Sequence, residues 1–310
     1  MRTDPKRLHW LDQARGAALL AMTAYHLSWD LFSLGVSSIN PVTTQALAWS
    51  AKIIAAVFLA LSGFSLVTAH AQTIEWRKIR PRLLKLAGAA ALVSLGSFVL
   101  FPASWIAFGI LHHMALASLL GLLFLRWSAL PLAGLALVVL ILPDFARTDF
   151  FNAPLFLFLG LARIVAPAND YVPLLPWFGF FLAGMAWAKT IPLHPPASAP
   201  ADPSRPLRLI GFLGQHSLLY YLIHQPVLLG LLNLLLALGL LSPAQNQRVE
   251  FTAACERDCS FDLGDEQICR RICGCIYDDL QTAPDVLTTP PALMSPKQEG
   301  RLRQAIKQCR

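Results

Sequence analysis

Residues 11–30 of the chain read LDQARGAALLAMTAYHLSWD, and this stretch decides the fold class. At 100° per residue, five of its polar side chains fall within an arc of roughly 80° on one helix, and the rest of the helix surface is mainly apolar. Such a helix crosses a bilayer with its apolar surface towards lipid and its ionisable stripe against protein or water. The side chains of the stripe are Asp12, Arg15, Thr23, His26 and Asp30.

Ionisable groups within membrane helices are usually retained for function, but a simpler explanation of the stripe stays open. In that explanation Asp12 and Arg15 only pair at the membrane interface, and His26 is a hydrogen-bonded packing residue. At 1.5 Å per residue, His26 lies about 21 Å along the helix axis from Asp12. If Asp12 and Arg15 lie at one membrane face, His26 is therefore close to the other.

The composition indicates a membrane protein with several spanning helices. Of the 310 residues, 55% are hydrophobic and 14% are charged, whereas a soluble domain carries about 25% charge. Seven apolar segments are each long enough to cross about 30 Å of hydrocarbon. We therefore predict an all-α integral membrane bundle of about seven helices, or eight if residues 150–164 also span. The seven segments are 12–34, 46–70, 82–101, 107–126, 128–143, 172–190 and 208–241.

The net charge of +7 follows from Lys and Arg in short segments between the apolar runs. This is the positive-inside pattern, and it places the N-terminus in the cytoplasm and the C-terminal tail outside. Residues 144–171 are the exception, because Arg147 and Arg163 run against the alternation, although this segment also holds Asp144, Asp149 and Asp170. No basic patch lies outside the membrane-flanking segments, so we expect no nucleic acid as a partner.

One basic segment has a second explanation. Arg77, Arg80 and Arg82 follow the second apolar segment, and membrane topology alone accounts for them. The same guanidinium groups are also suited to the phosphates of a cofactor at the cytoplasmic face. Both explanations stay open.

Histidines from three predicted helices are expected to lie at a similar depth in the membrane. His112 lies about 8 Å below the outer surface and His224 about 24 Å above the inner one, which is near the level of His26. Tyr220 and His224 are spaced i,i+4 and so share a helix face. No His-x-x-x-His pair occurs, and the nearest carboxylate at this depth is Asp30, so we predict no metal site.

Five motifs occur along the chain in one order. They are D-x-x-R-G at 12–16, F-L-x-L-S-G at 58–63, F-G-I-L-H at 108–112, P-W-F-G-F-F-L-x-G at 176–184 and S-L-x-x-Y-L-I-H-Q-P at 217–226. Together they resemble the bacterial branch of the heparan-alpha-glucosaminide N-acetyltransferase catalytic-domain family over about residues 8–241. The resemblance implies a multi-pass enzyme of the bacterial cytoplasmic (inner) membrane. Such an enzyme moves acetyl from cytoplasmic acetyl-CoA to an amine or hydroxyl of an extracytoplasmic glycan.

In this interpretation His26 handles the proton or the acyl group during transfer, and Asp30, one turn further along the stripe, orients its ring. The lysosomal relatives are associated with a histidine in the first far-side loop, but residues 32–45 contain none. An acetyl-histidine intermediate and direct transfer therefore both stay open. The predicted catalytic residues are His26, Asp30, His112 and His224, and the predicted cofactor-binding residues are Asp12, Arg15, Arg77, Arg80 and Arg82.

Two other classes of function stay open alongside the enzyme. One is a transporter in which the buried His and Asp groups relay protons. The other is a non-catalytic scaffold that displays the C-terminal tail. For either class the bilayer is a partner, and a homo-oligomer is left open.

The tail is a separate object, because all six cysteines lie in the last 60 residues. We predict a transmembrane acyltransferase-like domain at 1–245 and an extracytoplasmic cysteine-rich region at 246–310. Two cysteine pairs spaced i,i+4 each share a helix face, which favours a disulfide-stapled helical hairpin. In the cytoplasm a four-cysteine zinc site would be the rival. Six cysteines allow fifteen pairings, and the sequence does not choose among them. The two pairs are Cys255 with Cys259 and Cys269 with Cys273.

Overall fold

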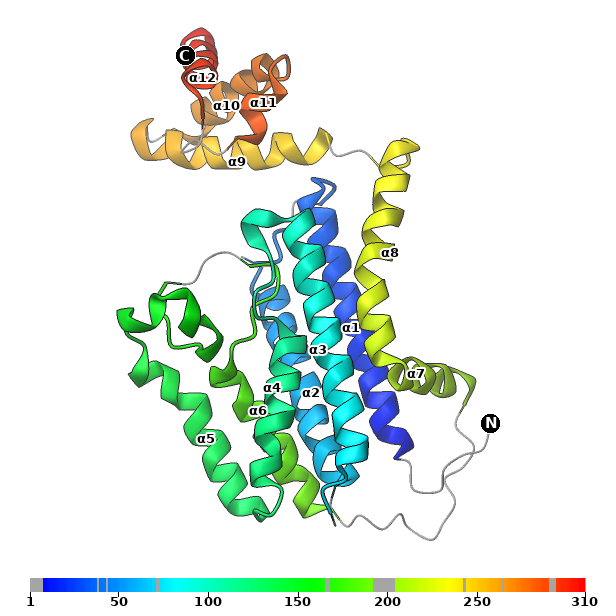
Figure 1. The fold of residues 1–310 in the computed structure, drawn as a ribbon. Helices are drawn as coiled ribbons and strands as arrows, with labels where there is room; N and C mark the ends of the chain where they lie inside the picture. Colours follow the sequence, from blue (N-terminus) through cyan, green and yellow to red (C-terminus); the bar gives the residue numbers. More distant parts are fainter. Residues whose placement is uncertain are drawn as a thin grey trace. The chain divides into compact units, whose positions relative to one another are not determined.

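The chain divides into two compact helical units (Figure 1). The first unit comprises Met1–Ala24 and Ala46–Pro226, and the second comprises Tyr25–Gln45 and Val227–Arg310. The domain boundary expected at residue 245 stays a prediction. This computed structural model describes residues 8–37, 39–42, 44–70, 73–164, 168–191, 204–241, 244–263, 265–289 and 294–309.

Each of the seven predicted apolar segments contains an α-helix. Four stretches are long and apolar enough to cross a membrane, namely Gln45–Ala69, Ile79–Leu100, Ala129–Ala146 and Ser217–Ala237. The protein is therefore a multi-pass membrane protein, while the count of seven or eight spans stays a prediction. The helices are α1 (His9–Ser33), α2 (Gln45–Ala69), α3 (Trp76–Leu100), α4 (Ile110–Gly121), α5 (Ala129–Ala146), α6 (Leu174–Thr190) and α8 (Ser217–Ala237).

Two boundaries differ in an informative way from the apolar segments. Helix α3 begins at Trp76 rather than at residue 82, so the basic residues before the apolar run belong to its first turns. The last predicted segment, 208–241, divides at His216 into α7 (Arg205–Gln215) and α8. Residues 192–206, which are rich in proline, lie mostly outside the described residues.

Residues 150–164, which would form the eighth span, contain no α-helix. Two 3-10 helices lie in this stretch, η3 (Asp149–Asn152) and η4 (Pro154–Leu159), separated by Ala153. At about 2.0 Å per residue, the longer of them covers only about 12 Å. Neither 3-10 helix crosses a bilayer.

Glycines from the motifs allow two helices of the first unit to cross closely. A Cβ atom on Gly63 of α2 would lie 2.0 Å from the carbonyl oxygen of Phe181 in α6. A Cβ atom on Gly184 of α6 would lie 1.9 Å from the carbonyl oxygen of Ala60 in α2. Because both positions face the crossing, only glycine fits at either one. This crossing fixes the face of α2 that carries Ser62 and Ser65.

A second close crossing joins α1 to α7. A Cβ atom on Gly16 would lie 1.9 Å from the carbonyl oxygen of Ile210, and one on Gly214 would lie 1.8 Å from that of Asp12. The glycine of the D-x-x-R-G motif is therefore a packing residue. It fixes the position of α7 against the turn of α1 that carries Asp12 and Arg15.

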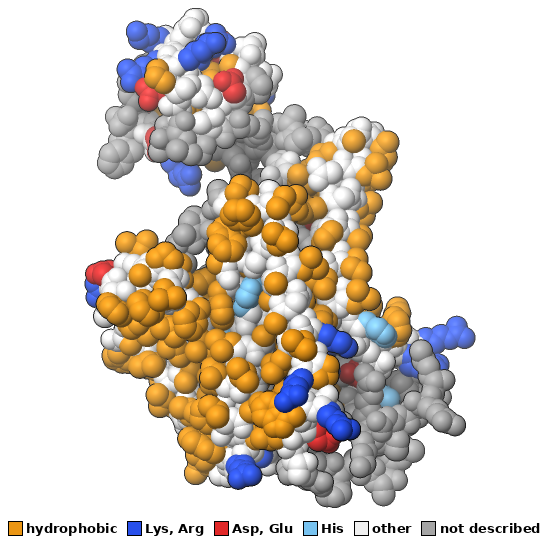
Figure 2. Space-filling model, viewed as in Figure 1, with side chains coloured by type: hydrophobic (Ala, Val, Ile, Leu, Met, Phe, Trp, Pro, Cys, Tyr) orange, Lys and Arg blue, Asp and Glu red, His pale blue; other side chains and the backbone are white. Residues whose placement is uncertain are grey.

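The apolar core of the first unit lies mainly between α2, α4, α5 and α6. Phe64, Leu66, Phe181, Leu182 and Met185 are at most 1% exposed. The outer surface of α5 is apolar as well, and Figure 2 shows hydrophobic side chains over it and over the segment that follows. An apolar exterior around an apolar core is the pattern of a helix bundle in lipid. The exposed apolar side chains of α5 include Leu130, Leu137, Val138, Ile141 and Phe145.

The second unit contains the cysteine-rich region. Helices α9 (Ala244–Leu263) and α10 (Glu266–Leu280) form a hairpin, followed by α11 (Pro284–Thr288) and α12 (Pro296–Cys309). Three disulfides join these helices, so the predicted disulfide-stapled hairpin is present, and a third disulfide adds α12 to it. The nested order of the two hairpin disulfides follows from antiparallel helices whose i,i+4 cysteines face each other. The pairs are Cys255 with Cys273, Cys259 with Cys269 and Cys275 with Cys309.

Candidate active site

A cavity of about 420 Å³ lies within the first unit, lined by residues of α1, α2, α3, α4 and α8. Its volume is within the range of about 300 to 1,000 Å³ that is common for ligand pockets. Three cationic side chains reach it from two helices: Arg15 from α1, and Arg82 and Lys85 from α3. The other lining residues are Phe58, Ser62, Pro81, Leu86, Met114, Ser217 and Leu218.

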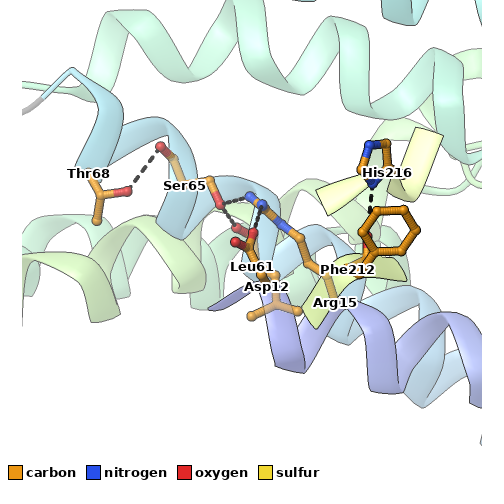
Figure 3. Close-up of polar contacts among 7 residues, drawn as sticks. All are labelled: Asp12, Arg15, Leu61, Ser65, Thr68, Phe212 and His216. Atoms are coloured by element: carbon orange, nitrogen blue, oxygen red, sulfur yellow. Dashed lines mark hydrogen bonds and ion pairs between the residues drawn. The ribbon is translucent and has the colours of Figure 1, made fainter. Parts of the chain in front are cut away.

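Arg15 is held in place by two neighbours (Figure 3). Its guanidinium donates a hydrogen bond to Ser65 Oγ of α2, and it also donates to Asp12 Oδ1 at 3.4 Å. Asp12 is buried, and its partner Arg15 lies one turn further along α1. We infer that Asp12 orients the guanidinium rather than contacting an anionic ligand itself.

Arg82, which belongs to α3, is held in the same manner. Its Nη2 donates to Ser62 Oγ at 3.1 Å, and Ser62 lies one turn before Ser65 on α2. The two arginines, from different helices, thus bind neighbouring hydroxyls on one face of α2. Like charges held close together repel each other. An anion bound in the cavity would relieve this repulsion.

Lys85 follows Arg82 by one turn of α3 and also lines the cavity. Among the described residues it forms no hydrogen bond or ion pair, so its ammonium group is available to a ligand. Arg77 and Arg80 are exposed and do not line the cavity. The cavity therefore brings together Arg15 and Arg82 from the predicted cofactor-binding residues, with Asp12 behind them.

Of the catalytic candidates, His112 and His224 belong to the first unit. His112 Nδ1 accepts a hydrogen bond from the backbone N–H of Gly109 at 3.3 Å, which leaves the proton on Nε2. That Nε2 lies 3.2 Å from Ser94 Oγ, whose own hydroxyl donates to the carbonyl of Ile106. Both ring nitrogens of His112 therefore have structural roles.

His224 presents the opposite tautomer. Its Nδ1 lies 2.7 Å from the carbonyl oxygen of Tyr221, and because a carbonyl only accepts, Nδ1 carries the proton. Nε2 is then the basic nitrogen of the neutral ring. Tyr220 lies on the same helix face, as the i,i+4 spacing predicted, and its ring stacks on that of His224 at a centroid distance of 6.0 Å. The Tyr220 hydroxyl lies 2.8 Å from Thr23 Oγ1, which joins the polar stripe of α1 to α8.

Asp170 connects the helices that carry these two histidines. Its Oδ2 accepts hydrogen bonds from the backbone N–H of Ile110 at 2.9 Å and from the hydroxyl of Tyr221 at 3.3 Å. Ile110 begins α4 and Tyr221 belongs to α8. Burial raises the pKa of the Asp170 carboxyl, and the two hydrogen bonds oppose this rise. A carboxylate at the start of a helix is also favourably placed in its dipole field.

His26 and Asp30 belong to the second unit, so their convergence with His112 and His224 stays a prediction. Both lie on α1, where the ring of His26 is 5.7 Å from that of Tyr25 and the Asp30 side chain is buried. Within the described residues, no group of three or more His, Cys, Asp or Glu side chains is arranged to hold a metal ion.

Several residues of the site were not predicted as site residues. Ser62 belongs to the F-L-x-L-S-G motif and Lys85 to the basic run, so both carried a signal in the sequence. Ser65 and Tyr221 carried none, because an isolated Ser or Tyr in an apolar helix has many structural roles. Asp170 belongs to the one segment that runs against the charge alternation.

These observations define a class of protein: a multi-pass helical membrane protein with a basic cavity and histidines on adjacent helices. The sequence model of the family described as "Heparan-alpha-glucosaminide N-acetyltransferase, catalytic" matches residues 7–226, and the chain belongs to this family. The match includes all five motifs, so the resemblance inferred from them is confirmed. No curated protein and no solved structure matches the chain.

Proposed function

We propose that the protein transfers acetyl from cytoplasmic acetyl-CoA to an amine or hydroxyl of an extracytoplasmic glycan. Membership of a membrane acetyltransferase family supports this proposal over a transporter or a scaffold. The family does not by itself supply the donor, the acceptor or the residues involved. The cavity supplies the argument for the donor.

The single observation that carries the proposal is the arrangement of cations around the cavity. Arg15, Arg82 and Lys85 line it, and none of the described residues that line it carries a carboxylate; Asp12, which pairs with Arg15, lies outside the lining. This excess of positive charge is suited to the phosphates of coenzyme A. Guanidinium groups bind phosphate oxygens in a bidentate manner, and their hydrogen bonds are strengthened by charge.

The cavity and His224 lie along one helix. Leu218 lines the cavity, and His224 follows it by six residues, or about 9 Å along the axis of α8. The extended pantetheine arm of coenzyme A is longer than this. With its phosphates at the arginines, the donor therefore has the reach to present its thioester beside the basic Nε2 of His224.

The proposed reaction is direct acyl transfer. The acceptor nitrogen or oxygen attacks the thioester carbonyl, a bond forms from it to the acetyl carbon, and the carbon–sulfur bond breaks. A histidine takes the proton from the acceptor and returns it to the leaving thiolate, so that coenzyme A departs as the thiol. An acetyl-histidine route differs only in that the imidazole nitrogen attacks first.

We assign this proton transfer to His26, as the sequence predicts. Asp30, one turn further along α1, would orient the ring of His26. His224 is the alternative, because its Nε2 is the basic nitrogen of the neutral ring. Both ring nitrogens of His112 have hydrogen-bond partners, so His112 has a structural role. The choice between these histidines does not affect the proposed binding site of acetyl-CoA.

The test uses purified full-length protein in lipid nanodiscs with acetyl-labelled acetyl-CoA and a glucosamine-terminated oligosaccharide. We expect label to appear on the oligosaccharide and free thiol to be released in equal amount. Thiol release without labelled oligosaccharide would point to another acceptor. No thiol release with any amine or hydroxyl acceptor would contradict the proposal.

A further inference from the structure

A second cavity of about 260 Å³ lies in the first unit, and its lining residues differ from those of the proposed donor site. Arg147, at the C-terminal end of α5, and Arg163, after η4, both line it. Tyr171 and Trp177 contribute aromatic rings to its wall. These are the two arginines that run against the charge alternation of the chain.

The positions of Arg147 and Arg163 are unexpected for the predicted membrane topology. Lys and Arg are disfavoured on the translocated side of a membrane protein, so two arginines in one such segment need a reason. Arg147 alone has one, because a cation at the end of a helix is stabilised by the helix dipole. That effect does not account for Arg163, which reaches the same cavity from a different segment.

The charges in the cavity are not balanced. Arg163 forms an ion pair with Asp149 at 3.1 Å, but both side chains are more than half exposed. Such an exposed pair contributes little to stability, so a ligand anion can replace the carboxylate. Within the part of the chain that the structure describes, Arg147 has no hydrogen bond or ion pair. Among the described residues, the charge of Arg147 is thus not paired, and that of Arg163 is paired only weakly.

The surroundings of the cavity are apolar. Phe145 is 84% exposed and Ile164 is 72% exposed, and they lie two residues before Arg147 and directly after Arg163. Phe150 and Leu155, from the intervening segment, are also exposed. Figure 2 shows this apolar surface over α5 and the segment that follows it. Tyr and Trp are the residues that prefer the membrane–water interface, which is the depth of lipid headgroups.

We propose that this cavity binds the phosphate of a membrane lipid headgroup, with Arg147 and Arg163 as the ligating groups. The volume of 260 Å³ is below the range of about 300 to 1,000 Å³ for pockets that enclose a whole ligand. It is therefore suited to a headgroup whose acyl chains lie outside, along the exposed apolar side chains. Basic pockets beside membrane helices bind anionic headgroups in this manner.

The test measures binding of dihexanoyl phosphatidylglycerol, below its micelle concentration, to the full-length protein in a neutral detergent. We expect Arg147→Gln to weaken binding about 10-fold, the loss expected for one charge-assisted hydrogen bond. Because Arg147 contacts no described residue by a hydrogen bond or ion pair, this variant should fold. Arg126→Gln, an exposed arginine outside the cavity, should bind as the wild type does.

A second variant should change affinity in the opposite direction. Asp149→Asn removes the carboxylate that competes for Arg163, so the lipid should bind at least as tightly as to the wild type. Unchanged affinity in Arg147→Gln, or weaker binding in Asp149→Asn, would overturn the proposal. Two further probes identify the source of the phosphate. Dihexanoylglycerol, which lacks phosphate, should bind far more weakly, and inorganic phosphate binding as tightly as the lipid would exclude a lipid headgroup.

Discussion

Arg15 and Arg82 come from different helices and donate hydrogen bonds to Ser65 and Ser62, one turn apart on α2. Neither interaction is local in sequence, since 50 residues separate Arg15 from Ser65 and 20 separate Arg82 from Ser62. Helix α2 therefore acts as the support on which two guanidinium groups are held side by side. The orientation of Ser62 and Ser65 depends on the crossing of α2 with α6, because this crossing fixes the rotation of α2 about its own axis.

The first prediction concerns this crossing. Gly63→Ala would place a methyl group 2.0 Å from the carbonyl oxygen of Phe181, so the helices must separate. We expect a loss of about 1–3 kcal/mol in the free energy of unfolding, as for other overpacked sites. Thermal unfolding in detergent, followed by tryptophan fluorescence, measures the change.

Gly88 provides the matched control, because a Cβ atom there meets nothing within 4 Å. Gly88→Ala should be neutral or stabilise α3 by up to about 1 kcal/mol, the intrinsic preference of a helix for Ala. Equal effects of the two substitutions would show that the crossing does not require glycine.

The second prediction concerns Asp170. Its pKa is raised in the folded protein by burial, so the folded state binds more protons than the unfolded state above pH 3.8. The free energy of unfolding should therefore fall as the pH rises from about 3.8 to the raised pKa. Asp170→Asn cannot titrate and should have a flatter pH profile in that window.

Tyr221→Phe sharpens the test of Asp170. It removes a hydrogen bond that lowers the pKa of Asp170, so the window should extend to higher pH. Unfolding temperatures recorded between pH 4 and 7 compare the three proteins. Parallel profiles for the wild type and Asp170→Asn would contradict the role given to burial.

The third prediction concerns the histidines. His26→Ala and His26→Asn should each lower the rate of transfer by about 10²- to 10⁴-fold, the range for loss of a general base, while acetyl-CoA binding is retained. His224→Gln is the comparison. If His26→Asn is fully active and His224→Gln is not, the proton-accepting role belongs to His224. Size-exclusion profiles of each variant must match the wild type.

The fourth prediction concerns the tail. An alkaline phosphatase reporter joined after Gln245 is active only outside the cytoplasm, and we expect activity there, from the distribution of Lys and Arg. The six cysteines, all paired in the structure, should then resist maleimide labelling until a reductant is added. An inactive reporter, or thiols that react without reductant, would contradict the extracytoplasmic placement.

The sequence predicted the helices well because apolar runs and i,i+4 spacing are local properties. Tyr220 and His224 share a helix face as predicted, and the facing cysteine pairs of α9 and α10 form the predicted staple. The start of α3 was predicted six residues too late, because charged residues such as Arg77 lower the apolar signal although they are good helix formers.

The site was less predictable because it depends on how helices cross. Arg82 and Arg80 were equivalent in the sequence, yet one lines the cavity and the other is exposed. Asp170 could not be assigned to the start of α4 without the fold, since 60 residues separate it from Ile110. The third disulfide, Cys275 with Cys309, likewise depends on the position of α12.

The central claim is that acetyl-CoA binds at the cavity lined by Arg15, Arg82 and Lys85. The most direct measurement is the affinity of purified full-length protein for acetyl-CoA, compared between Arg82→Gln and Arg80→Gln. These variants remove the same charge from positions two residues apart on α3, but of the two only Arg82 lines the cavity. We predict a loss of at least about 10-fold for Arg82→Gln and little change for Arg80→Gln. Equal losses, or wild-type affinity in Arg82→Gln, would contradict the claim.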